Sequence, residues 1–103
     1  MKRLSEEEQL RSLHEELKLP WAISDGCLTI QLSFKSLQEV HELLTRLARE
    51  ANEQHHHPDI AVNAKEVTIS LTTYDAAGLT LLDVAFAQAV EKHVERIRSL
   101  RTI

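Results

Sequence analysis

Two stretches of the 103-residue chain place an apolar residue at every second position, and they constrain the fold more than any other feature. The first stretch runs from Leu28 to Phe34, and the second runs from Val67 to Leu71. Side chains of a β-strand point alternately to the two faces of a sheet, so this pattern predicts two strands that each bury one face.

Each of these strands has a neighbour in the sequence. The pair Asp25-Gly26 precedes the first stretch and is typical of a two-residue hairpin turn, which predicts a partner strand just before it, with Trp21 and Ile23 on one face. A short and weaker strand is expected around Ile60 and Val62, joined to the second stretch by a polar turn over residues 63–66.

Three segments carry apolar residues at helical spacing, and each begins with a capping signal. Ser5 with Glu8, Ser36 with Glu39 and Thr80 with Asp83 mark the three starts. Pro20 is expected to end the first helix, and Pro58 to stop the second, which we expect to run into a row of histidines. The expected apolar stripes are Leu10, Leu13 and Leu17; Leu37, Val40, Leu43, Leu44, Leu47, Ala48 and Ala51; and Phe86, Val90, His93 or Val94, Ile97 and Leu100.

The expected order is therefore α-β-β-α-β-β-α, in a single domain over residues 1–103. This order predicts an α+β fold in which a four-stranded antiparallel sheet is covered on one face by three helices. The open edges of such a sheet are left for water or for a partner subunit, so we expect that the protein is not a monomer. The last helix supports this, because Ala85, Phe86, Ala89 and Val90 offer more apolar surface than one sheet face needs.

Composition excludes several classes of protein. Twelve basic and sixteen acidic residues give a net charge of −4 without a clustered basic face, so we expect no nucleic-acid binding. Arg96, Arg98 and Arg101 are interpreted as cations that complement the dipole of the last helix. No apolar run reaches the length of a membrane span or a signal peptide, which predicts a cytoplasmic protein. The single Cys27 excludes an internal disulfide and is expected to be a buried or half-buried thiol.

The stretch NEQHHHPD, residues 52–59, holds three of the six histidines. Consecutive side chains on a helix point about 100° apart, so His55, His56 and His57 cannot share one metal ion, and we expect no metal site. Two interpretations stay open: a polar end to the helix, or acid–base chemistry, since histidine titrates near neutral pH.

A resemblance supports the acid–base interpretation. From about Trp21 to near the C-terminus, the chain resembles the pterin-4a-carbinolamine dehydratase family. The residues that carry it are Phe34 and Lys35 before the second helix, Thr45 and Arg46 within it, His56, His57 and Pro58 after it, Ala77, Gly78 and Leu79 before the third helix, and Asp83 in that helix's first turn. The resemblance implies the fold predicted above and the loss of water from a 4a-hydroxytetrahydropterin, without cofactor or metal. It also implies a homodimer or a dimer of dimers, because members of that family pair their sheet edges.

The resemblance also implies a site, which this chain matches only in part. His56 and His57 correspond to the family's histidine pair, whereas Tyr74 stands where the family has a third histidine and Asn52 where it has a glutamate. Glu53 lies next door, but we expect the helix to turn it away. The pocket wall would include Pro58, Thr73, Asp83, and Ile60 in place of an aromatic residue. These replacements predict a degenerate catalytic site with little or no dehydratase activity, and His55 is expected to be only the solvated end of the helix.

Two functions follow from the resemblance. The first is a non-catalytic, protein-binding assembly factor or chaperone, similar in kind to the RuBisCO assembly factors of bacteria with α-carboxysomes, with RuBisCO subunits as the partner. The alternative is an active dehydratase for a pterin-like small molecule, in which His56 and His57 do the acid–base work and Tyr74 orients the substrate hydroxyl. Other binding roles, such as the transcriptional-partner role of some family members, also stay open.

Overall fold

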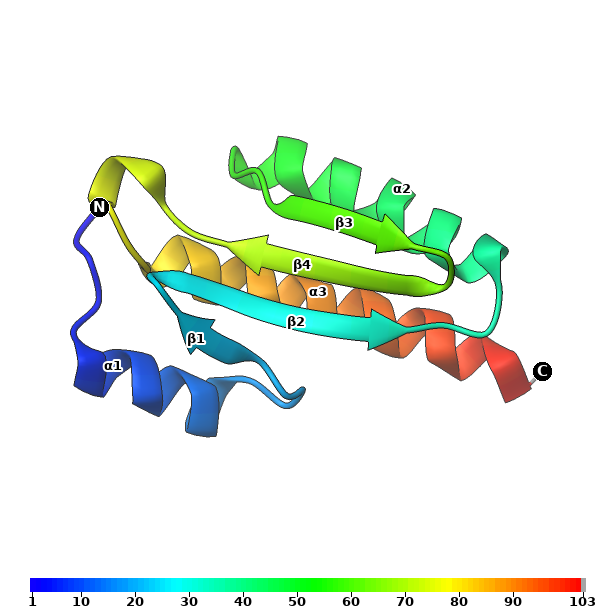
Figure 1. The fold of residues 1–103 in the computed structure, drawn as a ribbon, viewed down its shortest axis with the longest axis horizontal. Coiled ribbons are helices and arrows are strands. Elements are labelled where there is room, and N and C mark those ends of the chain that lie inside the picture. Colours follow the sequence, from blue (N-terminus) through cyan, green and yellow to red (C-terminus); the bar gives the residue numbers. More distant parts are fainter. Residues whose placement is uncertain (103) are drawn as a thin grey trace.

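The computed structural model describes residues 1–102 and confirms the predicted α+β fold and element order (Figure 1). The elements are α1 (Glu6–Arg11), which continues as a π-helical turn (Ser12–Glu16), β1 (Ala22–Ser24), β2 (Cys27–Ser33), α2 (Leu37–Gln54), β3 (Asp59–Asn63), β4 (Glu66–Leu71), a 3₁₀ turn (Tyr74–Ala76), α3 (Leu81–Ser99) and a last 3₁₀ turn (Leu100–Thr102).

The four strands form one antiparallel sheet in the order β1-β2-β4-β3. Ile30 on β2 lies opposite Ile69 on β4, and Leu32 lies opposite Val67, so the buried residues of both central strands share one face. Figure 1 shows α3 crossing behind this face, with α2 beside it and α1 next to β1. The core therefore lies between the sheet and the helices, as the alternating pattern predicts.

The predicted turn between β1 and β2 is confirmed. Ser24 pairs with Cys27, and the two residues between them, Asp25 and Gly26, have φ values of 53° and 74°. Both therefore adopt the left-handed conformation that a type I′ hairpin turn requires, and glycine adopts it without steric cost. Cys27 is half-buried, in agreement with the sequence.

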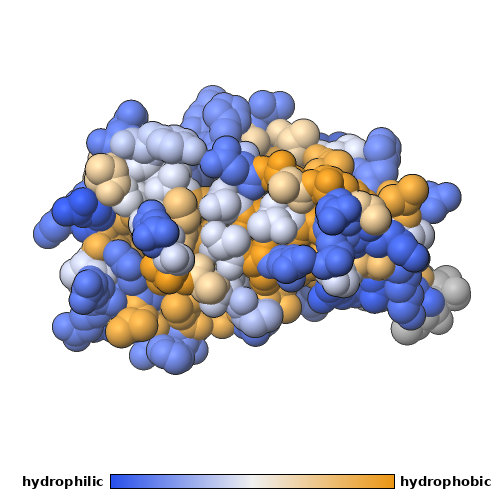
Figure 2. Space-filling view, viewed as in Figure 1, coloured by the Kyte–Doolittle hydropathy of each residue, from blue (hydrophilic) through white to orange (hydrophobic). Residues whose placement is uncertain are grey.

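The edge strand β3 is exposed along its whole length. Ile60 and Val62 lie opposite the buried residues Ile69 and Val67, and so on the helical side of the sheet, yet they remain 37% and 47% exposed. In Figure 2 hydrophobic atoms lie among polar ones in the upper right of the view, where Figure 1 places β3 and α2. The helices therefore leave this edge uncovered.

The predicted stripe of the first helix is wrong at Leu10, which is 56% exposed. The helix widens into the π-helical turn at Ser12, which rotates the following side chains, so Leu17 is buried and Leu13 partly buried. It also ends at Glu16, earlier than Pro20 requires.

The stripes of the longer helices are confirmed in their centres and wrong at their ends. Leu37 and Leu100 are exposed because the first turn of α2 and the residues after α3 extend beyond the core, and Ala48 is exposed on the outer face of α2. Val94, not His93, completes the buried stripe of α3.

The surplus apolar surface expected on α3 is smaller than predicted. Phe86 and Val90 have no exposed surface, and Ala85 is exposed and Ala89 partly exposed. The side chains of Phe86 and Val90 are therefore buried in the core of a single chain. They leave little apolar surface on α3 for contact with a second chain, so α3 gives little support to the predicted oligomer.

The arginines near the C-terminus have specific partners beyond the helix dipole. Arg98 lies over the ring of Phe34, 5.5 Å from its centroid, and donates a hydrogen bond to the Ser33 carbonyl. Arg101 binds Glu39 of α2 through two hydrogen bonds of 2.7 Å. Arg96 and Arg98 lie in the last turn of α3, as the dipole interpretation expects, and the contacts of Arg98 and Arg101 add to it.

Candidate functional site

A buried histidine–aspartate pair lies where the end of α2 meets the start of α3. His56 Nε2 is 2.6 Å from Asp83 Oδ1. The histidine is 8% exposed, and the aspartate has no exposed surface. A carboxylate removed from water in this way is stable only when hydrogen bonds and charge partners replace the lost hydration.

Two threonines supply those hydrogen bonds. The second carboxylate oxygen of Asp83 accepts from the Thr73 hydroxyl at 2.8 Å and from the backbone N–H of Thr80 at 2.9 Å. The two threonine hydroxyls also bind each other at 2.8 Å. Thr80 and Asp83 form the predicted capping box, so the first turn of α3 fixes the carboxylate in place.

The arrangement orients the imidazole of His56. Nε2 faces the carboxylate, and the ring packs edge-on against Phe86 with centroids 6.2 Å apart. The other ring nitrogen, Nδ1, makes no hydrogen bond to the residues that the structure describes. A carboxylate on one ring nitrogen fixes the tautomer and the ring orientation, which leaves the other nitrogen for proton transfer.

The backbone explains why only one of three consecutive histidines is buried. Helix α2 ends at Gln54, so it does not run into the histidines as expected, and His55 takes a left-handed conformation with φ of 52°. The N–H of His56 then binds the Ala51 carbonyl at 3.2 Å. This reversal directs His56 inward and leaves His55 and His57 exposed. His55 is thus the solvated helix end that the sequence predicts.

Tyr74 lies at the surface with 73% of its area exposed. Its hydroxyl donates a hydrogen bond of 2.9 Å to Asp59 Oδ2, at the start of β3. This hydrogen bond, together with the negative charge of Asp59, raises the pKa of Tyr74 above its usual value. Tyr74 is therefore held as a neutral phenol whose proton points at a carboxylate.

The structure brings together three of the predicted site residues and leaves others apart. His56, Thr73 and Asp83 belong to one buried network. Thr73 and Asp83 were expected in a pocket wall, but they are 9% and 0% exposed, so they hold His56 instead of forming an open surface. Asn52 and His57 are exposed, Ile60 is exposed on β3, and Pro58 is half-buried; Glu53, beside Asn52, is also exposed.

The sequence alone did not single out two residues of this region. Thr80 is recognised in the sequence only as a helix cap, although its hydroxyl also completes the network. Asp59 follows Pro58 without any motif of its own, and only the fold places it against Tyr74. The three-residue spacing of the capping box is a sequence signal that points to Thr80, but no sequence signal points to Asp59.

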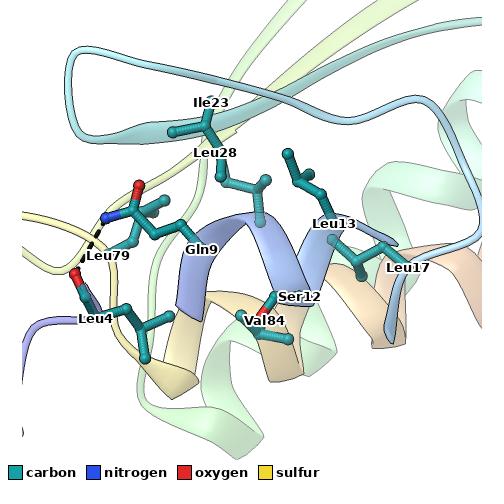
Figure 3. Close-up of a pocket in the computed structure, with 9 residues that line it drawn as sticks. All are labelled: Leu4, Gln9, Ser12, Leu13, Leu17, Ile23, Leu28, Leu79 and Val84. Atoms are coloured by element: carbon teal, nitrogen blue, oxygen red, sulfur yellow. Dashed lines mark hydrogen bonds between the residues drawn. The ribbon is translucent and has the colours of Figure 1, made fainter. Parts of the chain in front are cut away.

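The described residues contain no group of three or more histidine, cysteine, aspartate or glutamate side chains placed to hold a metal ion. None of the helices described is long and apolar enough to cross a membrane. The small pocket in Figure 3 lies between the N-terminal helix and the sheet, and His56 is not among the residues that line it. With about 10 Å³ of space it holds at most one water molecule and cannot admit a ring-shaped ligand.

Comparison with known proteins decides the family. The sequence profile described as "Pterin 4 alpha carbinolamine dehydratase" matches residues 2–93. The chain belongs to this family. A relative from Christiangramia forsetii is 36% identical over 92% of this chain and 96% of its own length. Another, from Aquifex aeolicus, is 33% identical over 94% and 96%. Both carry the provisional name pterin-4-alpha-carbinolamine dehydratase.

Solved structures confirm the fold of the pterin dehydratase family. A protein described as a transcriptional coactivator/pterin dehydratase from Brucella melitensis matches with a TM-score of 0.84 and 26% identity, over 89% of this chain and 98% of that one. A pterin dehydratase-like protein identified as a RuBisCO assembly factor in the alpha-carboxysome matches with a TM-score of 0.61 and 24% identity, over 72% and 86%. The second likeness concerns the fold alone.

Proposed function

We propose that this protein catalyses the dehydration of a 4a-hydroxytetrahydropterin to the quinonoid dihydropterin. The observation that carries the proposal is the buried pair of His56 and Asp83, which is completed by Thr73 and Thr80. A network of this kind holds one imidazole in a fixed orientation, as acid–base catalysis requires. Family membership supports the substrate class, because both relatives described above are named as pterin dehydratases.

The proposed chemistry assigns the acid step to His56. When the ring carries a proton on each nitrogen, the carboxylate of Asp83 balances its charge from the Nε2 side. The proton on Nδ1 is then given to the leaving hydroxyl, which departs as water while the carbon–nitrogen double bond of the product forms. A second group takes the proton of the neighbouring ring nitrogen from the solvent side, where both His57 and Tyr74 are exposed.

Turnover by purified protein tests the proposal, with the hydroxytetrahydropterin generated in the assay by a pterin-dependent hydroxylase. We expect the wild type to accelerate water loss above the uncatalysed rate, and we expect His56→Gln to reduce that acceleration by about a hundredfold or more. His55→Asn is the matched control, because His55 is exposed and asparagine tolerates its left-handed backbone. A wild type that does not exceed the uncatalysed rate refutes the proposal.

A second candidate is a protein-binding role as an assembly factor, with RuBisCO as the partner to test first. Two observations favour it: Asn52, which cannot titrate, and the uncovered edge strand β3 with Ile60 and Val62. An assembly factor for RuBisCO is expected to be retained in a pull-down with the RuBisCO large subunit. Retention that survives His56→Gln but is lost in Val62→Lys would assign binding to the edge and separate it from the catalytic site.

A further inference from the structure

Two side-chain links join the segment after α2 to the segment that leads from β4 into α3. The buried link is the pair of His56 and Asp83, and the exposed link is the hydrogen bond from Tyr74 to Asp59. The links are adjacent along both segments. Asp59 follows His56 by three residues, and Tyr74 directly follows Thr73, whose hydroxyl binds Asp83. The surface pair therefore lies beside the buried network.

The hydrogen bond between Tyr74 and Asp59 is accessible to a ligand, whereas the buried pair of His56 and Asp83 is not. Tyr74 is 73% exposed and Asp59 is exposed as well, so the phenolic oxygen is accessible from solvent while its proton is given to the carboxylate. An oxygen that donates its own proton still has lone pairs with which to accept another. This is the geometry of a relay, in which one proton arrives as a second one leaves.

We propose that Tyr74 and Asp59 form the proton relay that removes the ring-nitrogen proton during the dehydration. This inference rests on the proposed function and assigns to it the base that His56 does not supply. In this relay Tyr74 is the catalytic residue, because it takes the proton directly from the substrate nitrogen. Asp59 is a positioning residue that acts through Tyr74.

The step balances in atoms and charge. The bond between the ring nitrogen and its hydrogen breaks, and that proton moves to the Tyr74 oxygen while the tyrosine's own proton moves to Asp59 Oδ2. The electron pair left on nitrogen forms the double bond to the neighbouring carbon as the carbon–oxygen bond breaks. The hydroxyl leaves as water with the proton from His56. Solvent then returns one proton to the histidine and removes one from Asp59.

The relay explains how a tyrosine can serve at neutral pH. A free phenol is a poor base, because its ionised form is scarce below pH 10. In the relay the proton's final acceptor is a carboxylate, and the phenol never has to ionise in advance. The negative charge that faces the hydroxyl agrees with this, since Asp59 disfavours the ionised phenol.

Kinetics of single and double variants test the relay. We expect Asp59→Asn and Tyr74→Phe each to lower kcat by tenfold to a hundredfold, with KM changed less than about threefold. The double variant should be no slower than the slower single variant, because the two residues act as one unit. Asp59→Glu should recover part of the lost kcat. Asparagine at 59 can still accept the tyrosine hydrogen bond, so a purely structural link would leave kcat unchanged.

Asp75→Asn is the matched control, because it removes an exposed carboxylate from the same 3₁₀ turn that carries Tyr74. We expect it to keep wild-type kcat. The relay is overturned if Asp59→Asn keeps wild-type kcat, or if the losses of kcat in the single variants multiply in the double variant. It is also overturned if His57→Gln abolishes turnover while Tyr74→Phe keeps wild-type kcat, because His57 would then be the base. A wild type without turnover would instead refute the proposed function itself, and the relay with it.

The relay's hydrogen bond has a readout that does not require activity. Tyr74 is the chain's single tyrosine, so an ultraviolet titration of phenol ionisation follows it directly. We expect its pKa to fall in Asp59→Asn and to stay unchanged in Asp75→Asn, since the hydrogen bond to Asp59 and that residue's charge raise it. An equal pKa in wild type and Asp59→Asn would show that the pair does not form in solution and would overturn the relay.

Discussion

At the scale of single residues, the ion pair of Glu39 and Arg101 shows how one contact sets acid stability. Glu39 accepts two hydrogen bonds from Arg101 and one from the Lys35 N–H, and its pKa is lowered from 4.5 to about 2 by Arg101 and these hydrogen bonds. The side chains are only 16% and 22% exposed, so solvent screens the pair less than a surface pair. The pair joins the start of α2 to the residues after α3.

Arg101→Gln is expected to lower the midpoint of urea unfolding at neutral pH, because it removes the two charge-assisted hydrogen bonds to Glu39. Glu39 has a depressed pKa in the folded state, so its contribution is full above pH 4.5 and is lost as the pH falls toward about 2. Urea unfolding of wild type and variant should therefore differ at neutral pH and converge at about pH 2. Arg11→Gln, in the exposed pair with Glu7, should change stability by less than about 0.5 kcal/mol. A difference that persists in acid would contradict the assignment.

At the scale of elements, one side chain of α3 holds the segment between the N-terminal helix and β1. The carboxylate of Glu91 accepts hydrogen bonds from the backbone N–H groups of Lys18 and Leu19 and from Trp21 Nε1, at 2.7 to 3.1 Å. These donors have no strand or helix partner of their own, so Glu91 substitutes for regular backbone pairing. It fixes the position at which Trp21 enters the core.

Glu91→Ala is expected to destabilise the fold by about 2–3 kcal/mol, because the partly buried N–H groups of Leu19 and Trp21 lose a charged acceptor. Trp21 is the chain's single tryptophan, so its fluorescence should shift to longer wavelength as water reaches the indole. Glu95→Ala, one turn further along α3 and exposed, serves as the control and should leave both quantities unchanged. If the variant keeps the wild-type emission and unfolding midpoint, the contacts of Glu91 are dispensable.

At the scale of the whole molecule, the open edge of the sheet favours self-association. Strand β3 presents unpaired backbone groups, and its apolar residues Ile60 and Val62 are exposed on the helical side. Exposed edge strands are templates for pairing with another strand, and a second copy of β3 offers the same surface in antiparallel orientation. We therefore still predict a homodimer or a dimer of dimers, and we expect the contact between chains to lie at β3 and not at α3.

Sedimentation at micromolar concentration is expected to show at least twice the chain mass of 11.8 kDa. Val62→Lys should shift the protein toward the monomer, because it places a charge in the apolar surface of the edge. Leu10→Lys is the control: Leu10 is 56% exposed but lies on α1, away from this edge, so it should not change the assembly. A wild type that sediments as a single chain would contradict the prediction.

The features that depend on near neighbours along the chain are predictable from the amino-acid sequence. Alternation over Leu28–Phe34 and Val67–Leu71, the Asp25-Gly26 turn and the three helix caps predict the element order and the antiparallel sheet, because each signal acts within a few residues. The resemblance added the histidine pair and the family, and the family profile confirms the latter.

Contacts between side chains that are far apart in the sequence depend on how the elements pack in three dimensions. The tertiary structure buries His56 and not its neighbours, because a left-handed residue at 55 turns the ring toward Asp83, 27 positions away. It pairs Tyr74 with Asp59. It also exposes Leu10, Leu37 and Leu100, whose spacing predicts burial. Leu10 lies just before the π-helical turn that changes the helical spacing, and the other two lie where the helices extend beyond the core. The spacing of apolar residues predicts which face of its own helix or strand a side chain lies on. The residues that this side chain contacts depend on how separate helices and strands pack.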